Sequence, residues 1–331
     1  MSNQTYESYV ENKIFKPLGM SKSTLATPPD NAGVIPPNPH FWGIDAGIQN
    51  PAGGIYSSSN DLAKYLRYIL THYNALATGV NWFNPNSPSQ GLYSHYGMPW
   101  ELFQTDRILE DSKRTVRFVT KGGGLPGYFS LVTMAPEYGV GVTILVAGKV
   151  DMLTKIQDAV GATIVRAAEA IAIRQLQERY AGTYASTNHK LNTTITLEAD
   201  SRGLVVTEFI SNGTDALSFG LPGFMSSDHW YAQLVPTLLY RVEKEQKGEL
   251  WRMQIAQERM GSRDSIWDEF CINDADHPLY ASVAYNELVL WDQKDGKFQT
   301  LELSAFRVNL TRTEKRQGAL VWNFAQETLE L

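Results

Sequence analysis

A lysine followed by three glycines combines the residue types that a ligand-binding strand edge needs. Lys121, Gly122, Gly123 and Gly124 follow a segment, residues 114–120, in which apolar and polar side chains alternate. A glycine has no Cβ, so the backbone of a ligand can approach it closely. A glycine inside a strand also commonly marks a bulge. From these residues alone, a bulge that precedes a hairpin is the favoured interpretation.

The other reactive side chains have simpler structural explanations. Ser57, Ser58 and Ser59 lie near the start of a predicted helix, where capping explains them better than nucleophilic chemistry does. The single cysteine, Cys271, excludes an internal disulfide and a thiolate-rich metal site. The histidines lack the spacing of metal ligands, so we interpret them as surface or core residues and expect no cofactor. They are His40, His72, His95, His189, His229 and His277.

The composition is that of an ordinary globular protein with 331 residues, a length that suits about two domains. The formal net charge is -6 and no basic block occurs, which argues against a nucleic-acid partner. The longest apolar stretch, around Val140–Ala147, is far shorter than the roughly 20 residues of a membrane helix, so we expect no membrane contact.

No secretory signal is recognisable before the first predicted helix, so the chain as written is expected in the cytoplasm. Glycosylation sequons begin at Asn3, Asn192, Asn212 and Asn309. Secretion is therefore the alternative if a longer N-terminus exists.

The first part of the chain is predicted to begin with two helices. Residues 5–16 carry apolar side chains at helical spacing, and Pro17 and Gly19 end this helix. A proline-rich loop then leads to a second helix that Ser59 or Asn60 caps. Both helices are expected to bury one face.

Three strands and a long helix complete an α/β sandwich. The strand of residues 114–120 runs into the glycines, and Tyr128–Met134 and Gly139–Val146 form an antiparallel hairpin. The helix Met152–Arg179 is expected to cover one face of this sheet. Its predicted buried stripe consists of Leu153, Ile156, Val160, Ile164, Ala168, Ile171 and Leu176.

Short β-rich segments replace this pattern after Tyr180–Tyr184, which predicts an antiparallel barrel or sandwich. We place the domain boundary there, giving domains 1–180 and 181–331. Aromatic residues of the second domain, among them Trp230, Trp251 and Trp291, are interpreted as core or as the lining of a ligand cavity. The predicted strands are Asn192–Leu197, Leu204–Ile210, Trp230–Val235, Leu238–Val242, Leu250–Ile255, Glu287–Trp291, Thr300–Phe306 and Leu320–Phe324.

Several motifs, in order along the chain, resemble the superfamily of serine β-lactamases, penicillin-binding proteins and esterases, in its class C-like branch. The segments resemble the helix and PLGM turn, the AGG…S..DLA segment, the YGxxWE strand and the Lys/His-x-Gly strand of that branch. They are Tyr6–Met20, Ala52–Ala63, Tyr96–Glu101 and Lys121–Tyr128. Tyr180–Tyr184 and Ile210–Asp215 resemble the C-terminal β domain of a fungal subgroup.

The resemblance implies a β-lactamase/transpeptidase-like α/β fold, N-terminally incomplete, followed by an all-β domain. It places Lys121 as a positive charge near the substrate or the nucleophile, and the backbone N–H of Gly124 in the oxyanion hole. Gly122, Gly123 and Tyr128 would contact the substrate. With these motifs present, a wall for an acyl substrate becomes the favoured interpretation of the glycines.

The sequence departs from the family at the nucleophile. No Ser-x-x-Lys and no Tyr-x-Asn occur in it, so domain 1–180 is expected to be the C-terminal portion of the fold. The first hypothesis is a serine hydrolase or acyltransferase for amides or esters, acting in fungal secondary metabolism, with this chain inactive alone. The second is a non-catalytic protein that binds a small molecule, a partner chain or its own copy over the incomplete sheet.

Overall fold

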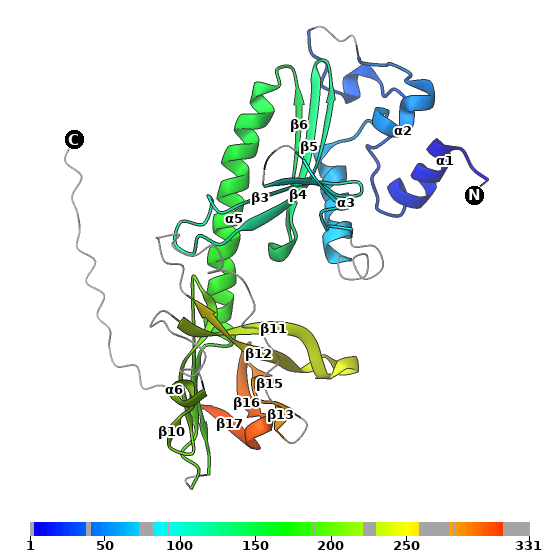
Figure 1. The fold of residues 1–331 in the computed structure, drawn as a ribbon. Helices are drawn as coiled ribbons and strands as arrows, with labels where there is room; N and C mark the ends of the chain where they lie inside the picture. Colours follow the sequence, from blue (N-terminus) through cyan, green and yellow to red (C-terminus); the bar gives the residue numbers. More distant parts are fainter. Residues whose placement is uncertain are drawn as a thin grey trace, which may run out of the picture. The chain divides into compact units, whose positions relative to one another are not determined.

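The computed structural model divides into two compact units, Met1–Ala172 and Ile173–Leu331 (Figure 1). The division falls inside the long helix, eight residues before the proposed boundary at residue 180, which stays a prediction. The structure describes residues 3–37, 41–72, 82–89, 91, 93–188, 190–220, 230–257, 279–280 and 283–313.

The N-terminal helix is present as predicted. It consists of α1, Tyr6–Val10, and a π-helical continuation, Glu11–Phe15, and the Thr5 hydroxyl accepts a hydrogen bond from the N–H of Ser8 at 3.2 Å. Val10 and Phe15 pack in a small core with Met20 beyond the turn, where Gly19 adopts a φ of +64°. That left-handed conformation suits glycine, which explains the end of the helix at this point.

The second helix, α3, spans Ser59–Thr71. Its N-cap is Ser58, whose hydroxyl accepts a hydrogen bond from the N–H of Asp61 at 3.3 Å. The sequence therefore predicted the helix correctly but placed its cap one or two residues too late. Between α1 and α3 lie short helical turns at Asp30–Ala32 and Gly47–Gln49 and the helix α2, Asn50–Gly53.

An antiparallel sheet in the order β1-β2-β3-β4-β5-β6 forms the centre of the first unit, as far as this part of the chain is described. Leu66 and Ile69 of α3 pack against Val119 and Met134 on one face. On the other face, Val165 of the helix α5, Asp151–Arg179, packs in a cluster with neighbouring strand residues. The strands are β1 Ser87–Pro88, β2 Ser94–Tyr96, β3 Glu101–Thr105, β4 Val116–Leu125, β5 Tyr128–Ala135 and β6 Val140–Ala147.

The segment Tyr96–Glu101 is not a strand, contrary to the interpretation of the YGxxWE motif. Tyr96 ends β2 and Glu101 begins β3, and these two residues pair across a hairpin. The N–H of Gly97 donates to the carbonyl of Trp100 at 2.6 Å, which closes the turn. Pro99 lies inside this turn and has no N–H to donate to a ladder, so the chain reverses here instead of extending.

The long helix α5 spans Asp151–Arg179, close to the predicted bounds. Its predicted stripe is only partly buried: Ile171 is 46% exposed, and Val165, which lies outside the predicted stripe, is the fully buried residue among those described. The last turns of α5 belong to the second unit, and Leu176 packs against that unit's core. No single sheet face therefore covers the whole length of the helix.

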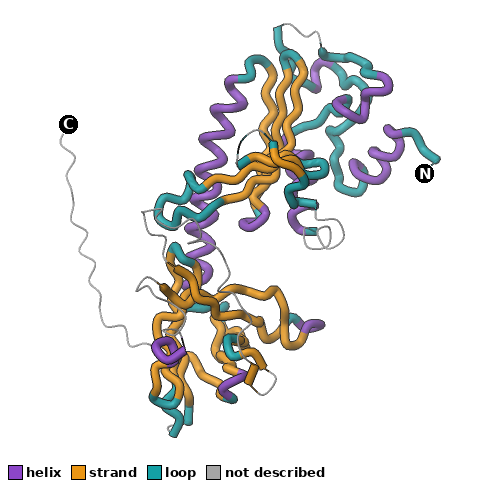
Figure 2. The backbone as a smooth tube through the Cα atoms, in the orientation of Figure 1, coloured by secondary structure: helices purple, strands orange, loops and turns teal. Residues whose placement is uncertain are grey.

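Eight strands of the second unit close into an antiparallel barrel within the described residues, because β8 pairs with both β7 and β9 (Figure 2). Tyr184, Ile195, Phe209 and Leu301 are among the side chains that fill its core. The barrel strands are β7 Gly182–Ser186, β8 Thr194–Asp200, β9 Gly203–Ser211, β11 Trp230–Val242, β12 Lys247–Gln257, β15 Glu287–Lys294, β16 Lys297–Leu303 and β17 Val308–Thr313.

The predicted barrel strands are largely confirmed. The two segments predicted at Trp230–Val235 and Leu238–Val242 form one strand, β11, with an irregular register between Pro236 and Tyr240. The strands β7 and β17 were not predicted. The predicted strand Leu320–Phe324 lies outside the described residues.

The Tyr180–Tyr184 motif joins α5 to the barrel through Arg312 of β17. The guanidinium donates to the carbonyls of Arg179, Ala181 and Phe298 at 2.6–2.9 Å and to the hydroxyl of Tyr184 at 2.7 Å. Tyr184 is fully buried, and a Cβ at Gly182 would meet Nη1 of Arg312 at 2.8 Å. Glycine at this position therefore leaves room for the guanidinium.

Candidate active site

The second half of β4 has a strand neighbour on one side only, within the described residues. The pairing of β4 with β3 ends at Thr120, opposite Glu101. The pairing with β5 continues to Leu125, opposite Tyr128. On the side that faces away from β5, Lys121–Leu125 therefore presents an open edge, where its main-chain groups have no partner strand.

The hydrogen bonds show which main-chain groups face this edge. The N–H of Gly122 points away from β5 and donates to Oε2 of Glu101 at 3.0 Å. Main-chain groups alternate in direction along a strand, so the N–H of Gly124 points to the same edge. Gly124 lies beyond the end of β3, and no hydrogen bond from its N–H to that side occurs among the described residues.

Gly123 and Gly124 differ in whether the surrounding structure requires a glycine. A Cβ at Gly123 would lie 2.5 Å from the hydroxyl oxygen of Ser130, so packing favours glycine there. A Cβ at Gly124 would lie 3.7 Å from the ring of Phe129, an ordinary contact, and its φ is not in the left-handed region. Neither packing nor conformation requires glycine at position 124, although glycine in a strand costs stability.

Lys121 forms an ion pair that the sequence did not predict. Its Nζ lies 2.7 Å from Oε1 of Glu101 and donates to the carbonyl of Gly122 at 2.9 Å. Glu101 is the last residue of the YGxxWE motif. That motif was the feature of the sequence from which a position of Glu101 near the Lys121 strand could have been predicted. The antiparallel pairing of β3 with β4, in which Glu101 lies opposite Thr120, brings the two side chains together.

Tyr128 lies opposite the end of the glycine segment and contacts the proline-rich loop. Its ring stacks with that of Trp42 at 6.3 Å between centroids, and Trp42 in turn packs edge-on against Tyr56 at 5.3 Å. Burial, and then the neighbouring Tyr56, raise the pKa of Tyr128, so its hydroxyl stays protonated at neutral pH. This hydroxyl is buried without a hydrogen-bond partner in the described part of the chain.

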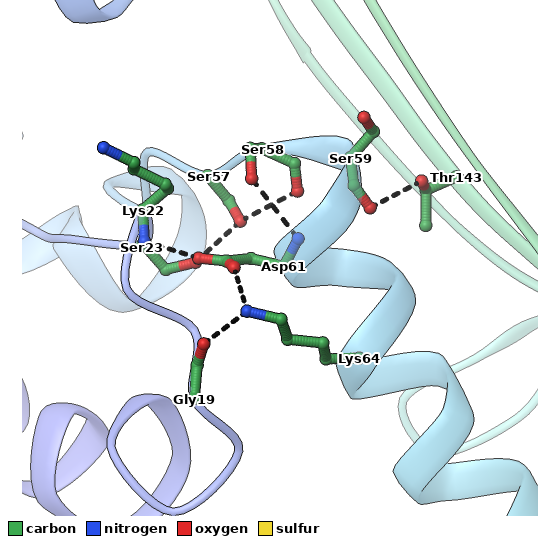
Figure 3. Close-up of polar contacts among 9 residues, drawn as sticks. All are labelled: Gly19, Lys22, Ser23, Ser57, Ser58, Ser59, Asp61, Lys64 and Thr143. Atoms are coloured by element: carbon green, nitrogen blue, oxygen red, sulfur yellow. Dashed lines mark hydrogen bonds and ion pairs between the residues drawn. The ribbon is translucent and has the colours of Figure 1, made fainter.

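The serines near α3 belong to a structural network around the buried carboxylate of Asp61, which is 2% exposed (Figure 3). Asp61 accepts hydrogen bonds from the N–H of Lys22 at 2.6 Å and the hydroxyl of Ser23 at 3.0 Å. Lys64 completes the network at 2.9 Å, and the hydroxyls of Ser23 and Ser57 lie 2.8 Å apart. Ser58 caps the helix, so capping explains one of the three serines, although the predicted cap residues were Ser59 or Asn60.

No group of three or more metal-binding side chains occurs in the part of the chain that the structure describes. His40, His189, His229 and His277 lie outside the described residues. None of the described helices is long and apolar enough to cross a membrane.

Comparisons with known proteins agree with the division of the fold. The β-lactamase family model matches residues 1–162, and the model of the β-lactamase-like C-terminal domain matches residues 172–314. The probable hydrolase clz13 of Cochliobolus lunatus is 31% identical over 343 residues, which cover 99% of this chain and 55% of the relative. A probable hydrolase of a Phoma species is 30% identical over 327 residues, which cover 95% and 54%.

Among solved structures, the octameric penicillin-binding protein homologue from Pyrococcus abyssi aligns with a TM-score of 0.36 and 16% identity, over 93% of this chain and 60% of that chain. The chain spans about half the length of the curated relatives it matches.

Proposed function

Because the chain belongs to the β-lactamase-like superfamily, we propose that the open edge of β4 is the substrate wall of a serine hydrolase or acyltransferase. In this proposal an amide or ester carbonyl lies along Lys121–Leu125 and is attacked by a serine to form an acyl-enzyme. The fungal relatives described as probable hydrolases support the reaction class.

The observation that carries the proposal is the N–H of Gly124. It faces an edge beyond Glu101, the first residue of β3, where a developing oxyanion would find a fixed donor. Glycine at this position has no packing or conformational reason in the described structure. A ligand that approaches the main chain closely supplies that reason.

The chain provides only part of this chemistry. The 331 residues contain no Ser-x-x-Lys, so the nucleophile and its base would come from outside them. Lys121, already paired with Glu101, would support the site as a positioning residue and not as the base. We therefore expect residues 1–331 alone to show no turnover.

Hydrolysis and acyl transfer share the same acyl-enzyme and differ in the acceptor that removes the acyl group, so both belong to the proposal. A role in fungal secondary metabolism is also proposed and is supported by the fungal origin of the relatives named above.

A second candidate is a binding protein whose sheet is completed by another chain. β6 is the last strand of the six-stranded order, and no described strand covers its outer edge. Unpaired main-chain groups along an apolar strand favour pairing with a second strand. This edge supports a partner chain or a second copy as the occupant.

The experiment uses the protein isolated from its natural source together with variants of the same length. We expect it to hydrolyse p-nitrophenyl butyrate and to gain one covalent adduct from a fluorophosphonate, measured as intact mass. Gly124→Pro removes the proposed donor without breaking a β4–β5 hydrogen bond and should lower kcat about 10²–10³-fold. Gly124→Ala keeps the N–H, and its Cβ fits beside the chain's own atoms. Its methyl group should hinder the close approach of the substrate and raise KM, whereas kcat should fall much less than in Gly124→Pro.

Absence of both turnover and adduct in the natural protein would contradict the proposal. An equal loss in the proline and alanine variants would contradict the role of the Gly124 N–H.

A further inference from the structure

The carboxylate of Glu101 occupies the two donors at the start of the open β4 edge. Oε1 lies 2.7 Å from Nζ of Lys121, and Oε2 accepts the N–H of Gly122 at 3.0 Å. A carboxylate arriving from solvent would need these same two donors. The side chain of Glu101 therefore holds the position that an anionic substrate group would take beside the lysine.

The pair also removes the net charge that would attract an anion. Lys121 and Glu101 are 46% and 43% exposed, so the pair contributes little to folding stability. The pair has a larger effect on the binding of an anionic ligand. A carboxylate beside Lys121 would lie equally close to the Glu101 carboxylate. Attraction and repulsion then nearly cancel.

The far end of the edge is apolar. Leu125 is 42% exposed, and Tyr128 opposite it stacks on Trp42. The open main-chain donor of Gly124 lies between the neutralised lysine and this apolar end. A substrate carbonyl at Gly124 would therefore have its apolar acyl chain beside Leu125 and Tyr128. Its other side, beside Lys121 and Glu101, would have to be uncharged.

We propose that the β4 edge selects an uncharged acyl group with an apolar substituent, and that Glu101 is the residue that discriminates against a carboxylate-bearing substrate. This inference rests on the proposed function, because it assumes that the acyl group lies along Lys121–Leu125. It adds the substrate class and names a specificity residue that the sequence motifs did not identify.

The test measures binding, so that it does not depend on turnover. Two matched amides are titrated against residues 1–331 by equilibrium dialysis: butyryl p-nitroanilide, which is uncharged, and succinyl p-nitroanilide, which ends in a carboxylate. The wild-type chain should bind the uncharged amide at least tenfold more tightly. Glu101→Gln leaves Lys121 with an unbalanced charge and should shift the ratio of the two Kd values at least tenfold toward the carboxylate.

Two controls complete the design. Glu110→Gln makes the same change at a carboxylate that pairs with Arg166 of α5, and it should leave the ratio unchanged. Lys121→Met in the Glu101→Gln background should abolish the shift. An unchanged ratio in Glu101→Gln, a wild-type preference for the carboxylate, or no binding of either amide would overturn the inference. Binding as expected by a natural protein without turnover would contradict only the proposed function.

Discussion

The carboxylate of Asp61 and the main-chain N–H of Lys22 lie 2.6 Å apart, although 39 residues separate them in the chain. Asp61 lies in the first turn of α3, and Lys22 lies just after the turn that ends the N-terminal helix. This hydrogen bond, with that from Ser23, fixes the N-terminal segment against the helix that packs on the sheet. The hydrogen bonds to Asp61 therefore help to fix the N-terminal helix relative to α3.

Asp61→Asn should destabilise the first unit by about 2–3 kcal/mol, because charged hydrogen bonds in a buried site are lost and the amide group faces donors. Urea unfolding followed by tryptophan fluorescence measures the change. Asp158→Asn makes the same chemical change at an exposed position of α5 and should stay within about 0.5 kcal/mol. Equal effects of both substitutions would contradict the structural role of Asp61.

Sequence reasoning identified contacts that are local in the chain and missed those that close long loops. The α1–π segment, α3 and the β5–β6 hairpin follow from side-chain spacing and turn residues over a few positions. Glu101 pairs with Lys121 only because a hairpin and a strand bring them together. Arg312 reaches carbonyls more than 130 residues away, which no local pattern encodes.

The acid sensitivity of the fold should depend on Asp61. Burial alone would raise the pKa of Asp61, but hydrogen bonds from Lys64, Lys22 and Ser23 hold it below its ordinary value of about 3.9. The stabilisation is therefore complete above about pH 5 and is lost as the pH falls through the pKa of the folded state. The difference in unfolding free energy between wild type and Asp61→Asn should shrink between pH 5 and pH 2.

This dependence is measured from urea midpoints in a series of buffers. Asp200 and Asp215 also have lowered pKa values, from hydrogen bonds with Arg202 and Ser218, so both proteins will lose stability in acid. Only the difference between them reports Asp61. A difference that stays constant over the series would contradict the prediction.

Self-association, if it uses the outer edge of β6, should be sensitive to a proline at Leu145. Gly123 and Ser130 pair through main-chain hydrogen bonds, since the N–H of Gly122 faces the other way. The next ladder then uses Leu131 and Ile144, which leaves the N–H of Leu145 on the outer edge. Leu145→Pro removes an edge donor without breaking the β5–β6 ladder.

Sedimentation velocity should show oligomers for the wild-type chain and monomers for Leu145→Pro, with unchanged circular dichroism. Ile144→Pro breaks a ladder hydrogen bond and should instead lower the unfolding free energy by about 3 kcal/mol. Oligomers that persist in a folded Leu145→Pro chain would exclude this edge as the interface.

Arg312→Lys should destabilise the barrel although it preserves the charge. The guanidinium donates in one plane to the carbonyls of Arg179, Ala181 and Phe298 and to the Tyr184 hydroxyl, and an ammonium group cannot reach all four. Buried acceptors that lose their donors cost about 1–3 kcal/mol each, so a loss of about 2–4 kcal/mol is expected. Arg174→Lys, at an exposed position of α5, is the matched control and should have almost no effect. Similar unfolding midpoints for the two lysine variants would show that the charge of Arg312, and not its geometry, holds α5 to the barrel.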